Sequence, residues 1–350
     1  MNTSYLDMIR GKRPTVTPVW YMRQAGRSQA AYRKIKESYS LFEITKQPEL
    51  CAQVTALPVE EYGVDAAIIY KDIMSPMAGM DVAIDIKPGV GPIFDSPIRT
   101  LSDIEKLHPF DQTKVSYIGD TIRLLQGGML QVPLIGFGGA PFTIASYLIE
   151  GGPTKNYNKT RGLLLSAPKA WQALMNRLSD MTIDYLLMQA EAGVDAVQIF
   201  DSWVGAVNVD QYKCSIYPYM ERIIMSVKDK FPNLPIAMNG VGTAHLVELW
   251  MELPLDIICL DWRCSIAHAD GLGVTQTIQG NLDPAYLYVD KSTLMREVDR
   301  ILTEGIRHGR HIFNLGHGVF PEANPDVIKW LTEYVHDRSR TLWGDLGEDE

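Results

Sequence analysis

Short apolar runs rich in valine and isoleucine recur along the chain, and stretches with helical periodicity separate them. The runs are 16–21 (VTPVWY), 64–70, 132–137, 194–200, 234–238, 255–261, 274–280 and 310–316. Near-continuous apolar strands that alternate with amphipathic helices are typical of a parallel sheet covered by helices. Eight such strands are the number that closes a TIM-type barrel. The pattern therefore predicts an α/β fold of the (β/α)8 barrel type.

The longest helical stretch supports this interpretation. Residues 166–193 carry Pro168 near the start, apolar residues at helical spacing and Gly193 at the end, so they predict one long helix. An open doubly wound sheet is the alternative fold. That fold usually has a glycine-rich phosphate-binding turn after its first strand, and the sequence MRQAGR, which follows the run 16–21, is not such a turn.

Nothing in the chain marks a domain boundary. The 350 residues contain no repeat, low-complexity linker or abrupt change of composition, so we expect a single barrel domain over 1–350. A basic loop region, about 10–36, is expected at the mouth of the barrel. The ending GDLGEDE, 344–350, is expected to be a short, solvated acidic tail.

Charge is distributed unevenly. The net charge of -9 argues against nucleic acid or an anionic membrane surface as a partner, yet residues 1–36 hold eight Lys and Arg and one acidic residue, Asp7. A concentrated basic region on an acidic chain fits a small polyanionic ligand better than a long one. The sequence has no signal-peptide pattern and no run as long as a membrane span, which predicts a cytoplasmic protein.

The four cysteines predict free thiols. They form no CxxC pair, and their low number suits a reducing cytoplasm. Cys259, Cys264 and His268 could be interpreted as a loose metal set, but their spacing matches no structural zinc pattern. We therefore expect no metal site.

In a barrel of this type, catalytic residues follow the carboxyl ends of the strands. In chain order these ends are MRQAGR, KD, GGAPF, DSW, NG, DW, GN and GHG. Glycine and asparagine also occur in turns for reasons of backbone geometry. The arginines, Asp72, Ser202 and His317 are harder to explain in that way.

Arg23 and Arg27 are candidates for binding an anion. They are four residues apart, so on a helical turn they would share a face, and each guanidinium matches a carboxylate or phosphate bidentately. Gly26 between them would let the backbone approach a ligand. The alternative is a pair of surface arginines that pair with nearby acidic side chains.

Asp72 ends the apolar run DAAIIYKD. A partly desolvated carboxylate accepts hydrogen bonds only, so it suits a ligand with several N–H donors or a developing positive charge. A salt bridge to Lys71 or to one of the arginines is the alternative role.

Three further side chains are candidates for ligand contacts. Tyr147 lies on an expected helix over 143–150 and could direct its hydroxyl at a ligand, although packing in the core is the commoner fate of such a tyrosine. Ser202 in FDSWVG lacks the GxSxG nucleophile elbow, which favours a hydrogen-bond donor. His317, between two glycines, could act as an acid, a donor or a metal ligand, or could pack against backbone.

These segments resemble the uroporphyrinogen decarboxylase family. The resemblance runs in order from about residue 13 to 326 and rests on RPTVTPVWYMRQAGR, LFEITKQPEL, GVDAAIIYKDI, GFGGAPFTIASYLIEGG, VQIFDSWVG, LDW, QGNLDP and FNLGHGVFPEANPD. It implies a distorted (β/α) barrel, a homodimer, and removal of CO2 from the four acetates of uroporphyrinogen III to give coproporphyrinogen III. It also implies that no metal or organic cofactor takes part.

The resemblance assigns roles to residues of this chain. It implies that Arg23 and Arg27 hold substrate carboxylates, that Asp72 accepts the central pyrrole N–H groups, and that backbone around the ligand comes from Gln24, Ala25 and Gly26. Tyr147, Ser202 and His317 fall on other substrate contacts, and Phe42 is a candidate for the pocket wall. Protonation of a pyrrole carbon would create a cationic electron sink that Asp72 stabilises. The proton donor is left open: an arginine is a poor acid, so a water or a substrate carboxyl steered by Arg23 is at least an equal candidate.

The chain departs from the family pattern at a few positions. Lys71 stands where many members have serine, SQAAYR follows Arg27, and Cys259 stands where glycine is usual, which we interpret as a change in packing. Two other functions compete. Zinc-dependent methyltransferases share the barrel, but the strand ending PIAMNG has neither His nor Cys. A non-catalytic tetrapyrrole carrier has less reason to keep Asp72.

Overall fold

A curled parallel sheet forms the centre of the computed structural model, which describes residues 2–87, 91–152 and 154–345. The order of its strands is β1-β4-β5-β6-β7-β8-β9. They are β1 (Ala67–Ile68), β4 (Leu134–Gly139), β5 (Ala196–Phe200), β6 (Ile236–Asn239), β7 (Ile257–Cys259), β8 (Thr277–Leu282) and β9 (His311–Leu315). Each coincides or overlaps with a predicted run, so seven of the eight predicted strands are confirmed.

The eighth predicted strand, 16–21, closes the sheet into a barrel. Val19 forms a parallel bridge with Phe313 of β9, and on its other side the Val19 carbonyl accepts a hydrogen bond of 2.7 Å from the Asp65 N–H, just before β1. Pro18 has no N–H, so the segment cannot extend its ladder and remains a single bridge. The predicted (β/α) barrel is therefore confirmed, and it is distorted where its first strand is short.

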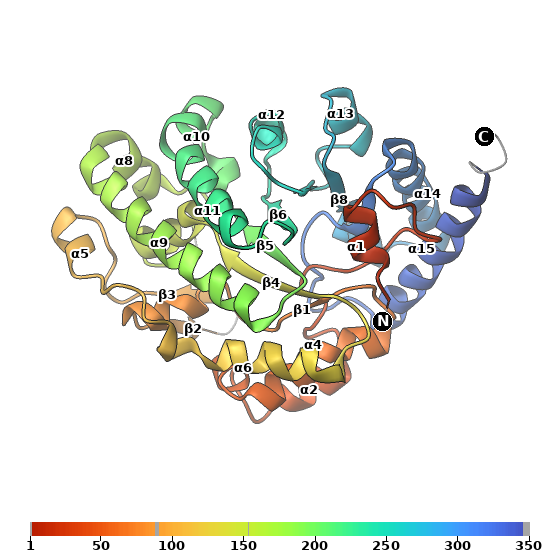
Figure 1. Ribbon diagram of the computed structural model, residues 1–350, viewed down its shortest axis with the longest axis horizontal. Helices are drawn as coiled ribbons and strands as arrows, with labels where there is room; N and C mark the ends of the chain where they lie inside the picture. Colours follow the sequence, from red (N-terminus) through yellow and green to blue (C-terminus); the bar gives the residue numbers. More distant parts are fainter. Residues whose placement is uncertain (1, 88–90, 153, 346–350) are drawn as a thin grey trace.

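Helices cover the outer side of the sheet (Figure 1). Those of the first half are α1 (Ser4–Ile9), α2 (Ala30–Lys36), α3 (Leu41–Thr45), α4 (Pro48–Tyr62), α5 (Leu101–Glu105), α6 (Tyr117–Leu124), α7 (Pro141–Glu150) and α8 (Asn158–Ser166). Those of the second half are α9 (Pro168–Ala192), α10 (Val209–Ser215), α11 (Tyr217–Lys230), α12 (Val247–Met251), α13 (Ile266–Gly271), α14 (Lys291–His308) and α15 (Pro325–Asp345). Because helices pack outside and side chains fill the inside, every residue of β4 to β9 is buried.

The long predicted helix is confirmed as α9. It begins at Pro168, whose missing N–H is no loss in a first turn, and ends where Gly193 adopts a φ of 105°. The helix predicted over 143–150 is also confirmed, as the larger part of α7.

Two features lie outside these predictions. A short antiparallel pair, β2 (Asp85–Lys87) and β3 (Gly91–Ile93), lies between β1 and β4 along the chain and forms a separate small sheet. It was not expected from the sequence. Of the predicted acidic tail, Gly344 and Asp345 belong to α15, and 346–350 lie outside the described residues. None of the described helices is long and apolar enough to cross a membrane.

The red N-terminal segment lies against the blue C-terminal helices (Figure 1). The Arg13 guanidinium donates to the Trp343 carbonyl and lies over the Trp343 ring, and the Thr17 N–H donates to the Ser339 hydroxyl at 2.9 Å. α15 therefore holds the segment that closes the barrel.

Asp65 joins three parts of this closure. One carboxylate oxygen accepts from the Asn2 amide at 2.6 Å. The other accepts from the Val19 N–H at 2.8 Å and from His336 Nε2 on α15 at 2.7 Å. Asp65 is only 3% exposed, so water cannot take over the hydrogen bonds of its carboxylate without rearrangement of the barrel.

Replacing Asp65 should weaken the whole barrel. We expect Asp65→Ala to lower the free energy of unfolding by about 2–4 kcal/mol, since a buried donor left without an acceptor costs about 1–3 kcal/mol. Urea denaturation followed by circular dichroism measures this loss. The control is Asp120→Ala, which removes an exposed ion pair with Arg123 on α6 and should change stability by less than about 0.5 kcal/mol. Equal losses in the two variants would contradict a special role for Asp65.

Candidate active site

The predicted site residues follow the carboxyl ends of several strands. Asp72 follows β1, Tyr147 lies on α7 after β4, Ser202 follows β5, His317 follows β9 and Arg23 follows the closing strand. Because all strands are parallel, these ends lie at one rim of the barrel.

The turn that carries Arg23 is fixed by buried amide side chains. Gln24 is 1% exposed; its side-chain oxygen accepts from the Tyr21 N–H at 3.0 Å, and its amide donates to the Ala66 carbonyl at 3.0 Å. The Asn314 side-chain oxygen accepts from the Met22 N–H at 3.0 Å. These bonds hold Arg23 at a φ of 61°, a left-handed conformation that a residue with a side chain rarely adopts.

Arg23 and Arg27 do not share a helical face, so that part of the prediction is wrong. Residues 22–29 form turns because Arg23 takes the left-handed conformation, and α2 begins only at Ala30. Both arginines are exposed, and within the described chain neither forms an ion pair with an acidic side chain. The geometry therefore does not support the alternative that Arg23 and Arg27 are surface charges paired with acidic side chains.

The two arginines lie in different surroundings. The charge of Arg23 acts on Asp72, Tyr147 and His317, and in each case it is one of the influences on that residue's pKa. Arg27 acts instead on Tyr32, whose pKa is raised by burial and lowered in part by this guanidinium. Arg23 therefore belongs to the centre of the site, and Arg27 lies toward α2.

Asp72 is an acidic side chain that lies within reach of the charge of Arg23. One of its oxygens accepts a hydrogen bond of 2.8 Å from the Met74 N–H, and its own N–H donates to the Ser75 hydroxyl at 3.2 Å. Burial raises the pKa of Asp72, while the Met74 hydrogen bond and then the positive charge of Arg23 lower it. The result is a fixed, poorly solvated carboxylate whose interaction with a cation is stronger than it would be in water.

Lys71 does not pair with Asp72, although the two are adjacent. Its ammonium donates to the Phe137 carbonyl at 2.6 Å and lies 3.5 Å from the ring centroid of Phe137 and 4.6 Å from that of Tyr185. Neighbouring side chains of an extended segment point to opposite sides, so Lys71 faces α9 while Asp72 faces the rim. Burial lowers the pKa of Lys71 well below its usual range.

Tyr147 on α7 and Ser202 after β5 are connected through Trp203 and Thr143, by one aromatic contact and a set of hydrogen bonds. The ring of Tyr147 is 6.0 Å from that of Trp203, in an edge-on arrangement. Thr143 on α7 donates to Asp201 at 2.8 Å and accepts from the Trp203 N–H at 3.1 Å, which fixes the half-buried Ser202 between them. Burial raises the pKa of Asp201 to about 7, against the lowering effect of the Thr143 hydrogen bonds.

His317 lies at the rim, where its surroundings favour the neutral imidazole over the protonated form. Burial lowers its pKa, and the charges of Arg23 and Arg263 lower it further. Its Nδ1 has no hydrogen-bond partner within the part of the chain that the structure describes. An unpartnered ring nitrogen beside cationic groups is available to a ligand oxygen or N–H group.

The two glycines beside His317 lie in close contact with other segments, Gly316 with backbone and Gly318 with the side chain of Arg23. A side chain at Gly316 would place its Cβ 2.4 Å from the Trp262 backbone nitrogen, and one at Gly318 would lie 2.5 Å from Cδ of Arg23. The loop after β9 therefore lies directly against the loop after β7 on one side and against Arg23 on the other.

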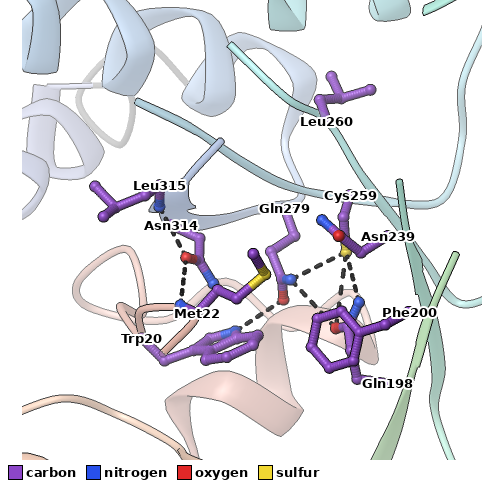
Figure 2. Close-up of a pocket in the computed structure, with 10 residues that line it drawn as sticks. All are labelled: Trp20, Met22, Gln198, Phe200, Asn239, Cys259, Leu260, Gln279, Asn314 and Leu315. Carbon is purple, nitrogen blue, oxygen red and sulfur yellow. Dashed lines mark hydrogen bonds between the residues drawn. The ribbon is translucent and has the colours of Figure 1, made fainter. Parts of the chain in front are cut away.

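A polar pocket lies inside the barrel, among residues that include the last ones of β5, β6 and β9 (Figure 2). Trp20 donates to Gln279 at 2.8 Å, and the amides of Gln279 and Gln198 reach the Cys259 sulfur at 3.0 and 3.3 Å. Cys259 thus joins a hydrogen-bonded network, which is more than the change in packing predicted for it. Burial raises the pKa of this thiol to about 12, so it is unreactive.

The remaining predicted residues have less direct positions. Ala25 packs against the small apolar cluster around Tyr32 and Tyr70, and Gly26 donates its N–H to Gln29. Phe42 is half-buried on α3 and is joined to the other predicted residues by no described hydrogen bond or ring contact. Within the described ranges, no three His, Cys, Asp or Glu side chains are grouped so that they could hold a metal, Cys259, Cys264 and His268 included.

Some residues at the rim are not among those that the sequence predicts. Trp203 packs on Tyr147. Trp262 lies edge-on to His317, with 6.4 Å between the ring centroids, and the Arg263 guanidinium lies over the Trp262 ring. Trp203 and Trp262 already stand in the strand-end segments DSW and DW, but neither was singled out as a candidate for ligand contacts. Arg263 comes one position after DW, so extending that segment by one residue would have found it.

A closed parallel barrel whose carboxyl-end rim carries a half-buried carboxylate, and two exposed arginines that form no ion pair within the described residues, defines a (β/α)-barrel enzyme with a site for an anionic ligand. Comparison with known proteins then identifies the family. A model of the family described as uroporphyrinogen decarboxylase matches residues 1–338. This chain belongs to the uroporphyrinogen decarboxylase family.

Individual relatives agree with this assignment. Uroporphyrinogen decarboxylase of Bacillus mycoides (strain KBAB4) is 56% identical over 341 residues, which is 97% of each chain. That of Geobacillus sp. (strain WCH70) is 56% identical over 339 residues, 96% of this chain and 97% of its relative. Among solved structures, a methyltransferase from Methanosarcina mazei superposes with a TM-score of 0.78 over 95% of this chain and 97% of its own, at 16% identity, which shows a shared fold.

The electrostatics of His317 can be tested directly. NMR titration of its ring protons should give a pKa below 6.5, and Arg23→Ala should raise that pKa, because a neighbouring positive charge opposes protonation. As pH falls below 6.5 the unfolded chain takes up this proton first, so His317 contributes progressively less stability until its folded pKa is reached. His317→Gln identifies the signal, and Arg340→Ala on α15 is the control. An unchanged pKa in Arg23→Ala would contradict the proximity of the two groups.

Proposed function

We propose that this protein removes CO2 from the four acetate side chains of uroporphyrinogen III, giving coproporphyrinogen III in haem and tetrapyrrole biosynthesis, without a metal or organic cofactor. Membership of the uroporphyrinogen decarboxylase family supports the reaction. The observation that carries the proposal for this site is Asp72, a half-buried carboxylate at a strand end, within the electrostatic reach of Arg23 and Tyr147.

The chemistry needs only a proton and a stabilised cation. Protonation of the ring carbon next to the one that bears the acetate makes the ring cationic. The bond between the acetate methylene and its carboxylate then breaks, the electron pair forms a double bond between the methylene and the ring, which neutralises the ring, and CO2 leaves. A proton adds to the methylene carbon to give the methyl group, and the ring carbon releases the first proton to restore the pyrrole, so one proton is consumed for each CO2. A fixed carboxylate in a poorly solvated site lowers the energy of the cationic intermediate more than water would.

In this proposal Asp72 accepts the central pyrrole N–H groups with the oxygen that the Met74 N–H leaves free. Arg23 and Arg27 bind carboxylates at the edge of the macrocycle, and backbone of Gln24, Ala25 and Gly26 surrounds them. Tyr147, Ser202 and His317 contact the substrate, and Phe42 forms part of the pocket wall.

The first proton comes from a water or from a substrate carboxyl that Arg23 holds in place. A guanidinium is charged at all accessible pH values and is a poor acid. The exposed and unpaired Arg23 beside Asp72 supports this arrangement, since it can hold a carboxyl group next to the ring that Asp72 stabilises.

The resemblance to the family also supports a homodimer in the cytoplasm as part of this proposal.

The competing functions make different demands. A zinc-dependent methyltransferase requires bound zinc, and a tetrapyrrole carrier requires no turnover. Purified protein incubated anaerobically with uroporphyrinogen III, with products separated by chromatography, tests the reaction. No decarboxylation would contradict the proposal.

Removal of the charge on Asp72 should abolish most catalysis. Asp72→Asn keeps the shape and leaves a neutral group facing the cation, so we expect kcat to fall by about 10²-fold or more. Asp81→Asn, an exposed aspartate that pairs with Lys114, is the control and should retain the parental rate. Circular dichroism checks the fold of both variants. A kcat within a few-fold of the parent would exclude Asp72 as the stabilising group.

The two arginines should differ in their effects. A charge-assisted bidentate bond is worth about 1.5–3 kcal/mol, so Arg23→Ala should lower kcat/KM by about 10- to 150-fold. Because Arg23 also lies beside Asp72, part of that loss should be in kcat, whereas Arg27→Ala should mainly raise KM. Lysine at either position should recover only part of the loss, since it keeps the positive charge but lacks the planar guanidinium that binds a carboxylate through two hydrogen bonds.

Product patterns show which carboxylate each arginine binds. The substrate loses acetates as it reacts but keeps its propionates. If an arginine binds an acetate, its alanine variant should accumulate partly decarboxylated intermediates in a changed pattern; if it binds a propionate, every step should slow together. Arg123→Ala on α6 is the control. Parental rates and patterns in both alanine variants would mean that these arginines are ordinary surface charges.

A further inference from the structure

A third arginine, Arg263, lies in the loop after β7. Its guanidinium carbon is 3.8 Å from the ring centroid of Trp262, and one terminal nitrogen donates to Asp261 at 2.8 Å. Stacking on one face and a bond at one end fix the orientation of a side chain that is still 50% exposed.

Asp261 cannot saturate this arginine. Its carboxylate is 1% exposed and also accepts from the backbone N–H groups of Gly242 and Arg263. Within the described residues, Nε and the second terminal nitrogen of Arg263 donate to no acceptor. That edge of the guanidinium offers two parallel N–H groups, which is the geometry that binds a carboxylate bidentately.

Arg263 faces the same part of the rim as His317. Trp262, on which Arg263 lies, is edge-on to His317, and Gly316 brings the backbones of the two loops into direct contact. Both Arg263 and Arg23 lower the pKa of His317 after the larger effect of burial. In the order of the loops around the barrel, His317 follows β9, Arg23 follows the closing strand and Arg263 follows β7, so His317 lies between the two arginines.

We propose that Arg263 binds a carboxylate of the substrate, next to the carboxylate bound by Arg23, and so helps to set which edge of the ligand enters the site. This inference rests on the proposed function. Uroporphyrinogen III carries an acetate and a propionate on every ring, so neighbouring carboxylates must be accommodated along the rim. Arg23, His317 and Arg263 provide a continuous set of donors for two of them.

The test compares Arg263→Gln, Arg263→Lys and a control, Arg340→Gln, whose exposed ion pair with Asp337 lies on α15. With uroporphyrinogen III as substrate, we expect Arg263→Gln to raise KM by about 5- to 20-fold, because a half-exposed charge-assisted pair is worth less than a buried one. We expect kcat to stay within about two-fold, since Arg263 does not touch the reacting ring. Lysine should restore part of the affinity.

Salt dependence separates binding from a merely structural role. If Arg263 binds a carboxylate, KM of the parent should rise with ionic strength more steeply than KM of Arg263→Gln, because screening acts on a pair that the variant lacks. A structural role through Asp261 would change thermal stability and leave the salt slope unchanged.

The outcomes are distinct. A parental KM and salt slope in Arg263→Gln, with the parent active on uroporphyrinogen III, would overturn the inference and leave the proposed function intact. Failure of the parent to decarboxylate this substrate would contradict the proposed function instead.

Inhibition by coproporphyrinogen III then identifies the bound group. Weaker product inhibition in Arg263→Gln supports a propionate, and unchanged product inhibition with a raised KM supports an acetate.

Discussion

The closure of the barrel at Val19 is the constraint on which the rest of the structure depends. This residue is held on one side by Phe313 and on the other by Asp65, and the segment cannot lengthen its ladder because Pro18 has no N–H. A two-sided contact of this kind fixes the direction in which the chain leaves the barrel. Arg23 follows within a few residues, so the position of the central arginine depends directly on the closure.

The interior of the barrel supports the rim in a different way. Side chains of Trp20, Gln198, Cys259 and Gln279 bond to one another where most proteins of this architecture pack aliphatic residues (Figure 2). Each buried polar group is satisfied mainly by another, and such networks specify one arrangement of neighbouring strands. Above them, Asp72 and Arg23 are separate charges, not an ion pair, so both remain available to a ligand.

The sequence predicted the barrel well because its signal is repetitive: apolar strands at regular intervals, with a proline-to-glycine helix such as Pro168–Ala192 between them. It also predicted which residues follow strand ends. It could not predict that Arg23 would take a left-handed conformation, because that depends on Gln24 and Asn314, the latter far away in the chain. Nor could spacing show that Lys71 turns away from Asp72 toward two aromatic rings, or that Arg263 stacks on Trp262. These are tertiary effects, which local patterns do not contain.

Gly318 has a further consequence for how this chain can diverge. Its backbone angle is ordinary, so other residues could adopt it, but the space of a side chain there is occupied by the aliphatic part of Arg23. A mutation at this glycine would be accommodated only by displacing an arginine encoded at the opposite end of the gene. The two positions are therefore coupled in one direction, since a side chain at 318 requires Arg23 to move, whereas Arg23 can be replaced while Gly318 is kept. A lineage that acquired a side chain at position 318 while keeping the barrel would be expected to have moved to a different ligand.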